Sequence, residues 1–130
     1  MLEEKILKEF RKVAIVGASP NKDRPSYKVF SYLTENGYNV IPVNPAVEQI
    51  SGKKCYPDIS SIPEKVDIVD IFRKSEDVLA IVAEAIKIGA KVVWMQEGVI
   101  NEEAAKKARE AGLLVVMDRC MKKEHERQRI

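Results

Sequence analysis

The chain contains 130 residues, of which 45% are hydrophobic and 32% are charged. This length fits one domain, and the hydrophobic fraction is normal for a folded globule, so disorder is not expected as the main state. The 22 Lys and Arg residues nearly balance the 20 Asp and Glu residues, and the resulting net charge of +2 disfavours nucleic acid or an anionic membrane as the main partner.

The N-terminal segment 1–11 predicts a helix over Leu2–Phe10 rather than a targeting signal, because it mixes acids with bases and lacks a hydrophobic core. No hydrophobic run reaches the roughly 20 residues of a membrane span. The two cysteines, Cys55 and Cys120, have no CxxC or histidine-rich context, so no metal site is expected. We therefore expect a cytoplasmic protein without membrane or nucleic-acid partners.

Five short, nearly continuous hydrophobic runs predict strands. Such runs are typical of parallel strands that are buried on both faces of a sheet, since half-exposed strands alternate between apolar and polar residues. The runs are Val13–Gly17, Asn39–Val43, Val66–Phe72, Lys91–Met95 and Leu113–Met117.

Helical patterns lie between these runs. Each begins at a residue that can cap a helix N-terminus and ends at a glycine placed just before the next strand. The three starts are Ser26, Ser75 and Asn101, and the three ends are Gly37, Gly89 and Gly112. This repeated helix–glycine–strand unit predicts right-handed βαβ crossovers.

Two segments depart from this pattern. Residues 45–63 contain three prolines and one glycine, which predicts a loop with a short extended piece near Lys54–Tyr56. The charged tail 121–130 predicts a solvated surface helix that carries the single histidine, His125.

The predicted architecture is one domain over residues 1–130: an α/β, doubly wound (Rossmann-like) five-stranded parallel sheet with helices on both faces. We expect the strand order 3-2-1-4-5, with a ligand bound beyond the carboxyl ends of the strands, at the switch point between the first and fourth strands.

The loop Gly17–Ser26 (GASPNKDRPS) follows the first strand and opens a helix. Gly17 lets a ligand approach the backbone closely, and free N–H groups at a helix N-terminus favour phosphate. Lys22 and Arg24 add positive charge, and two serines add hydroxyl donors. The alternative is an ordinary polar turn that happens to contain two bases.

Two common nucleotide sites are disfavoured. The dinucleotide fingerprint G-x-G-x-x-G fails because Ser19 and Lys22 stand at the later glycine positions. The second strand ends in Val43-Asn44-Pro45, without the acidic residue that would bind the ribose of NAD. The P-loop signature G-x-x-x-x-G-K-[ST] does not occur either.

Five stretches together resemble the small stand-alone CoA-binding proteins, which are related to the CoA-binding domain of the succinyl-CoA synthetase alpha subunit. The resemblance covers nearly the whole chain, and the motifs are specific jointly rather than singly. They are GASxxxxRPS from Gly17, VNP from Val43, DIFR from Asp70, QEGV from Gln96 and MDRC from Met117.

The resemblance implies a site for coenzyme A or an acyl-CoA, which would be bound through its phosphorylated adenosine and pyrophosphate. The pyrophosphate would lie along Gly17, Ala18 and Ser19, with Lys22, Arg24, Pro25 and Ser26 nearby. Val43, Asn44 and Pro45 would border the adenosine, Ile71, Phe72, Arg73 and Val78 would form the adenine side, and Gln96, Glu97 and Gly98 would approach the pantetheine arm.

The candidates for chemistry have structural explanations as well. Cys120 follows Arg119, which could lower its pKa, or it is a small buried residue. Asp70 lies in an apolar strand, so we expect a hydrogen-bonding partner, either a loop amide or a base such as Arg119. Glu97 is a general base or a partner of a pantetheine amide, and Trp94 is core close to the cleft.

We therefore expect a non-catalytic CoA-binding protein, as a homo-oligomer or with a partner subunit. Two alternatives stay open. One is an enzyme that acts on an acyl-CoA thioester with Glu97, Asp70 or Cys120 as the working group. The other is an NAD(H)-sensing regulatory domain, for which the chain lacks the fingerprint.

Overall fold

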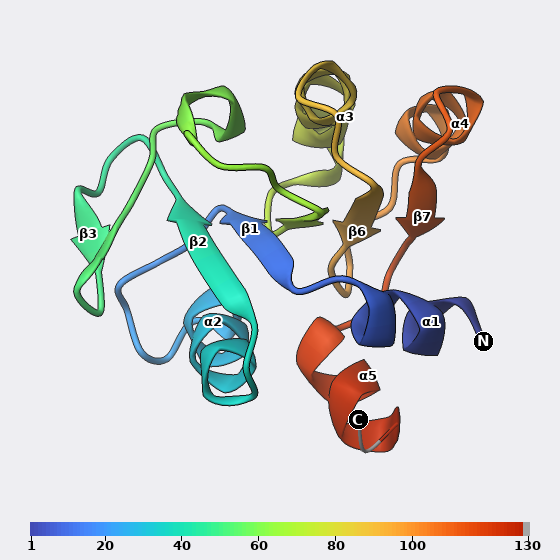
Figure 1. The fold of residues 1–130 in the computed structure, drawn as a ribbon. Coiled ribbons are helices and arrows are strands. Elements are labelled where there is room, and N and C mark those ends of the chain that lie inside the picture. Colours follow the sequence, from blue (N-terminus) through green and yellow to red (C-terminus); the bar gives the residue numbers. More distant parts are fainter. Residues whose placement is uncertain (129–130) are drawn as a thin grey trace.

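The computed structural model describes residues 1–128 and contains the predicted five-stranded parallel sheet (Figure 1). Every residue of the five strands is buried except the first residue of β1, β2 and β7, as the continuous hydrophobic runs indicate. The strands are β1 (Lys12–Val16), β2 (Asn39–Val43), β5 (Ile68–Ile71), β6 (Val92–Met95) and β7 (Leu114–Val116).

Helices cover both faces of the sheet, which confirms the doubly wound α/β class (Figure 1). Two of them, α3 (Val78–Lys87) and α4 (Glu102–Glu110), pack on one face. The other face is covered by α1 (Leu2–Glu9), α2 (Pro25–Glu35) and α5 (Met121–Gln128). The hydrophobic core therefore consists of two layers, one on each side of the sheet.

The strand order is β2-β1-β5-β6-β7, so the predicted order 3-2-1-4-5 is wrong. The third strand of the sheet, β5, pairs with β1, and β2 is left at the edge. Pro42 gives the physical reason, because a proline has no N–H and is confined to edge strands. Its carbonyl oxygen faces the open edge and accepts a hydrogen bond from Tyr56 N–H at 3.0 Å. The switch point therefore lies between β1 and β5.

The segment between β2 and β5 runs along this edge. It forms a short antiparallel hairpin, β3 (Gln49–Ile50) and β4 (Lys53–Lys54), and a single 3₁₀ turn, η1 (Ile59–Ser61). Tyr56 makes an isolated parallel bridge to Val43. The predicted loop with an extended piece near Lys54–Tyr56 is thus confirmed, and it covers part of the open edge of β2.

Two of the three predicted helix caps are wrong. Helix α2 has Arg24 as its N-cap and Pro25 in its first turn, where a proline fits because that N–H has no partner within the helix. Ser75 lies in a 3₁₀ turn, η2 (Ser75–Asp77), and its Oγ accepts from Ile100 N–H at 3.0 Å. The Asn101 cap is confirmed, since its side chain accepts from Ala104 N–H at 2.9 Å.

The charged tail forms a helix as predicted, but α5 is not simply a solvated one. Met121, Glu124 and His125 are buried, because positions three and four residues apart share one helix face. His125 Nδ1 lies 2.7 Å from the Tyr32 hydroxyl oxygen, so this face docks on α2. The pKa of His125 is lowered, first because burial disfavours its charged form. Residues 129–130 of the tail lie outside the described part of the chain.

Candidate functional site at the strand ends

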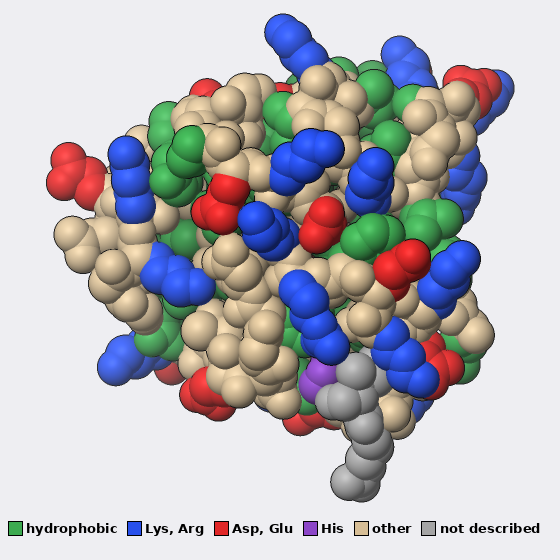
Figure 2. Space-filling view, in the orientation of Figure 1, with side chains coloured by type: hydrophobic (Ala, Val, Ile, Leu, Met, Phe, Trp, Pro, Cys, Tyr) green, Lys and Arg blue, Asp and Glu red, His purple; other side chains and the backbone are tan. Residues whose placement is uncertain are grey.

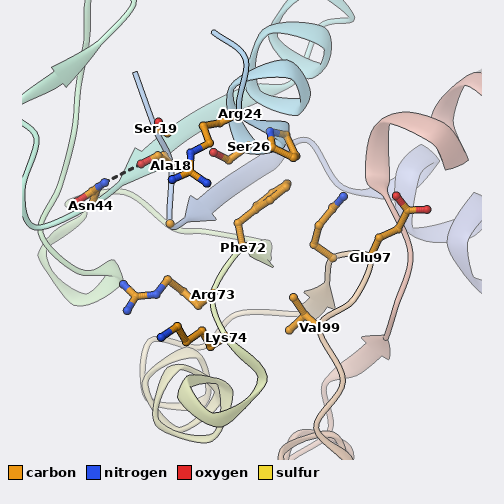
Figure 3. A pocket seen from close by; sticks show the side chains of 13 residues that line it. Ala18, Ser19, Arg24, Ser26, Asn44, Phe72, Arg73, Lys74, Glu97 and Val99 are labelled. Atoms are coloured by element: carbon orange, nitrogen blue, oxygen red, sulfur yellow. Dashed lines mark hydrogen bonds between the residues drawn. The ribbon is translucent and has the colours of Figure 1, made fainter. Parts of the chain in front are cut away.

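A cavity of about 660 Å³ opens at the carboxyl ends of β1, β5 and β6, beside the switch point (Figure 3). Its volume is in the range of small-molecule sites. The cavity brings together most of the residues predicted for the site. Those that line it are Gly17, Ala18, Ser19, Arg24, Pro25, Ser26, Asn44, Phe72, Arg73, Gln96 and Glu97.

The loop after β1 is held against β2 and β5. Gly17 has φ +89°, and a Cβ there would collide with the carbonyl oxygen of Phe72. The N–H groups of Gly17 and Ala18 donate to Val43 O at 3.0 and 3.2 Å, so these two donors are already used within the fold. Asn44 adds a brace, since its Nδ2 donates to Ala18 O at 2.8 Å. These contacts fix the start of the loop, and the N–H groups of Gly17 and Ala18 are not available to a ligand.

The charged side chains of the lining lie in separate groups around Phe72. Figure 3 shows Ser19, Arg24 and Ser26 on one side of Phe72, Arg73 and Lys74 on another, and Glu97 away from both groups. Arg73 Nη2 lies 3.2 Å from Asp77 Oδ2, and both side chains are exposed. Lys74 was not predicted, although it stands directly after the DIFR motif. Across the face seen in Figure 2, basic side chains lie with acidic ones between them.

A second cavity of about 350 Å³ adjoins the first, and both are lined by Gly17 and Arg73. Val43 and Pro45 lie here rather than in the main cavity. Its other lining residues come mainly from the loop after β2 and from η2 and α3, and they are both apolar and acidic. They include Pro57, Ile59, Ala80 and Ile81 together with Asp58, Glu76, Asp77 and Glu84.

Four predicted residues line neither cavity. Ile71, the last residue of β5, and Val78, the first residue of α3, are completely buried in the core layer between the sheet and the helices α3 and α4. Lys22 lines a separate shallow cavity on the outer face of α2, together with Lys28 and Lys122. The two bases of the loop therefore diverge, and only Arg24 reaches the main cavity.

The fourth, Gly98, supports the loop after β6. Its N–H donates to Asp118 Oδ1 at 2.7 Å, and Asp118 itself has a positive φ of 60°. The neighbouring Glu97 accepts two hydrogen bonds from Lys123 Nζ at 3.0 and 3.1 Å, which raises the pKa of Lys123. Val99 also lines the main cavity and was not predicted.

The environment of the buried Asp70 side chain differs from the prediction. Neither of its carboxyl oxygens has a hydrogen-bond partner among residues 1–128, so the predicted loop amide or Arg119 partner is wrong. Arg119 instead donates to Asp118 O at 2.8 Å. Complete burial raises the pKa of Asp70 well above its usual 3.8.

Cys120 and Trp94 both lie in the core layer on the α2 side of the sheet. Cys120 is a free thiol that is 7% exposed, which confirms the buried reading. Trp94 is completely buried, and its Nε1 donates to Arg119 O at 2.8 Å. Trp94 is thus a core residue, and it stands two positions before Gln96, which lines the cavity.

This fold and strand-end cavity define a small Rossmann-like ligand-binding protein. The chain belongs to the CoA binding domain family, whose model matches residues 11–126. The predicted resemblance is thereby confirmed, and the family supports CoA binding as the general function of the chain.

Three relatives illustrate the range of this family. The protein YneT of Bacillus subtilis is 37% identical over 122 residues, which cover 94% of this chain and 90% of YneT. Acetate–CoA ligase (ADP-forming) II of Archaeoglobus fulgidus is 33% identical over 100 residues, or 75% of this chain but 15% of the ligase. The structure of a hypothetical protein from Pyrococcus horikoshii is 50% identical, with a TM-score of 0.94 over 96% of this chain and 88% of that one.

Among residues 1–128, no helix combines the length and the hydrophobicity that a membrane crossing requires.

Proposed function

We propose that the chain binds coenzyme A, or an acyl-CoA, through the phosphorylated adenosine and pyrophosphate at the carboxyl ends of the parallel strands. The observation that carries this proposal is the pair of adjoining cavities at the β1–β5 switch point, with Arg73 in the lining of both. One cavity has three basic residues in its lining, and the other has an apolar and acidic lining, which suits a ligand with a phosphate part and a flat base.

The phosphates belong in the main cavity. Arg24, Arg73 and Lys74 line it, against Glu97 as the acid in the lining. Arg24 forms no ion pair with any residue in 1–128, so its guanidinium needs no release before it meets a phosphate. Charge-assisted contacts of this kind are the strong hydrogen bonds in phosphate recognition. The serine hydroxyls of Ser19 and Ser26 line the same part of the cavity.

The adenine belongs in the second cavity. Pro57, Ile59 and Ile81 offer apolar surface to a flat ring. The acids there, such as Glu76 and Asp77, disfavour a phosphate and can accept from the amino group of adenine. The pantetheine arm then runs along the main cavity toward Gln96 and Glu97.

The residues at the end of β2 support NAD binding less well than CoA binding. Asn44 stands where the ribose-binding acid of a dinucleotide site would stand, and it is occupied in bracing Ala18 O and in accepting from Ala46 N–H at 2.9 Å. A carboxylate at this place would also repel the 3′-phosphate of CoA.

The three candidate catalytic groups support a thioester enzyme less well than a binding protein. Glu97 is held by Lys123, and neither Cys120 nor Asp70 lines the cavity. Turnover of an acyl-CoA that is abolished by Cys120→Ala would favour the enzyme over the binding protein.

Calorimetric titration tests the proposal with four ligands: CoA, adenosine 3′,5′-bisphosphate, dephospho-CoA and NAD. We expect CoA to bind, the bisphosphate to compete with it, and dephospho-CoA and NAD to bind more weakly because they lack the 3′-phosphate. Equal binding of NAD and CoA would contradict the proposal. Arg109→Ala, in the last turn of α4 and away from both cavities, is the control for a nonspecific loss of positive charge.

A further inference from the structure

Three fully buried side-chain atoms have no hydrogen-bond partner among residues 1–128: Asp70 Oδ1, Asp70 Oδ2 and Gln96 Oε1. Asp70 is completely buried and Gln96 is 6% exposed. A buried polar atom without a partner is costly, so such atoms are uncommon in folded proteins. All three atoms belong to two side chains, Asp70 and Gln96.

The register of the sheet places the two side chains on one face. Asp70 pairs with Ile15 on β1 and with Trp94 on β6. Gln96 follows Trp94 by two residues, so it points to the same face and is the diagonal neighbour of Asp70 on the cavity side. Gln96 lines the main cavity. The carboxyl group of Asp70 therefore lies beneath the floor of the proposed CoA site, behind Gln96.

The protonation of Asp70 decides whether these atoms can satisfy one another. In the observed orientation of the Gln96 carboxamide, Oε1 is buried, and an ionised Asp70 carboxylate would leave three acceptors and no donor among these atoms. A neutral carboxyl has one O–H donor, which matches the free acceptor of Gln96. Burial is the single cause that raises the pKa of Asp70, so the neutral form is favoured.

No charged group on the helices that cover this face opposes the neutral form. The buried titratable groups in the core layer on this side of the sheet are Tyr38, Cys55, Cys120, Glu124 and His125. Glu124 is paired with Arg127 at 3.1 Å, and His125 contacts the Tyr32 hydroxyl. None of these groups contributes to the pKa of Asp70.

We propose that Asp70, in its neutral form, donates a hydrogen bond to Gln96 Oε1 and so holds the Gln96 carboxamide with its NH₂ group toward the cavity. The ligand group recognised there is then an uncharged acceptor, the carbonyl of an amide or of a thioester. Asp70 is thus a positioning residue that acts through Gln96. The ligand part of this inference rests on the proposed function, because it takes the pantetheine arm to lie at Gln96.

Two ligands and two variants test this role by calorimetry at neutral pH. CoA carries the pantetheine carbonyls, whereas adenosine 3′,5′-bisphosphate lacks them. Asp70→Asn keeps a donor for Gln96 Oε1, and we expect both affinities to stay within about twofold of wild type. Asp70→Val removes the donor but suits a buried strand, and we expect CoA to bind three- to tenfold more weakly while the affinity for the bisphosphate is unchanged.

Other results would overturn the inference: unchanged CoA affinity in Asp70→Val, or an equal loss for both ligands, which indicates general damage to the site. If Asp70→Val does not fold, Gln96→Leu provides the same test. This variant must also bind CoA more weakly and must keep the wild-type affinity for the bisphosphate. In a folded double variant that carries both Asp70→Val and Gln96→Leu, the losses of CoA affinity must not add, since both substitutions remove the same interaction.

Infrared spectroscopy of the unliganded protein separates this inference from the proposed function. We expect a carbonyl band of a protonated carboxyl group at neutral pH that is absent in Asp70→Asn. Its absence in wild type overturns the Asp70–Gln96 bond even if CoA binds. If the band is present and neither CoA nor the bisphosphate binds wild type, the proposed function fails, and the carbonyl-recognition part fails with it.

Discussion

The two walls of the main cavity use opposite kinds of chemistry. The outer wall, Ser19, Arg24, Arg73 and Lys74, carries charged side chains that reach solvent. The inner wall is formed by Gln96, with Asp70 and Trp94 buried behind it rather than in the lining, and burial is the one cause of the raised pKa of Asp70. Exposed charges can be substituted with little effect on the fold, whereas buried polar groups affect folding and binding together. The predictions below test this difference between the walls.

The largest effect is expected at Gly17, which lines both cavities. Gly17→Ala places a Cβ against the Phe72 carbonyl in a backbone with φ +89°, so we expect the loop to shift and CoA affinity to fall more than about tenfold. Gly112→Ala is the matched control, because it has the same φ of +89° and open space around its Cβ. Backbone strain alone should cost about 1–2 kcal/mol in both variants in denaturant unfolding, and Gly17→Ala should cost more because of the added collision. Equal CoA affinity in the two variants would show that the loop position is irrelevant.

The outer wall should respond through binding alone. Arg24→Ala and Arg73→Ala should each lower CoA affinity three- to thirtyfold, which corresponds to about 0.7–2 kcal/mol for partly solvated phosphate contacts. Arg24 should have the larger effect, because Arg73 is shared with Asp77. Thermal unfolding should be nearly unchanged, and added salt should weaken CoA binding to wild type. Calorimetry in a salt series measures the CoA affinities and their salt dependence. Unchanged affinity in both variants would contradict the phosphate assignment.

The inner wall should respond through the pH dependence of folding. The pKa of Asp70 is raised in the folded state, so its neutral form contributes full stability below about pH 4, and this contribution is lost as the pH rises toward the folded-state pKa. We expect the unfolding free energy of wild type to decline with pH over this window relative to Asp70→Asn. Urea unfolding of both proteins across the pH range measures the difference. A constant difference would mean that Asp70 titrates normally.

The smallest effect is expected at Trp94. It is fully buried but lies directly before Met95 and Gln96, so CoA that contacts Gln96 should shift its emission slightly. Trp94 is the single tryptophan, so the signal has one source. A titration in which calorimetry detects binding but fluorescence stays flat would separate Trp94 from the site.

Much of the fold follows from patterns in the sequence, because hydrophobic runs and helix-ending glycines are local signals. The strand order is harder to predict from the sequence, although Pro42 indicates an edge strand. The caps at Ser26 and Ser75 failed for a related reason: Pro25 and a 3₁₀ turn set the helix starts instead.

For the site, motif position predicted which loops meet but not where each side chain points. Ile71 and Val78 stand beside lining residues yet fill the core, and Lys22 turns away from Arg24 across the same short loop. The missing partner of Asp70 could not be read from the sequence either, since it depends on which side chains the register brings beside it.

The most direct test of CoA binding is mass spectrometry of the purified chain under non-denaturing conditions with added CoA. The account predicts a complex of one CoA per chain that is lost when adenosine 3′,5′-bisphosphate is added in excess and kept when NAD is added instead. A folded chain that retains no CoA, or that exchanges it for NAD as readily as for the bisphosphate, would contradict the account.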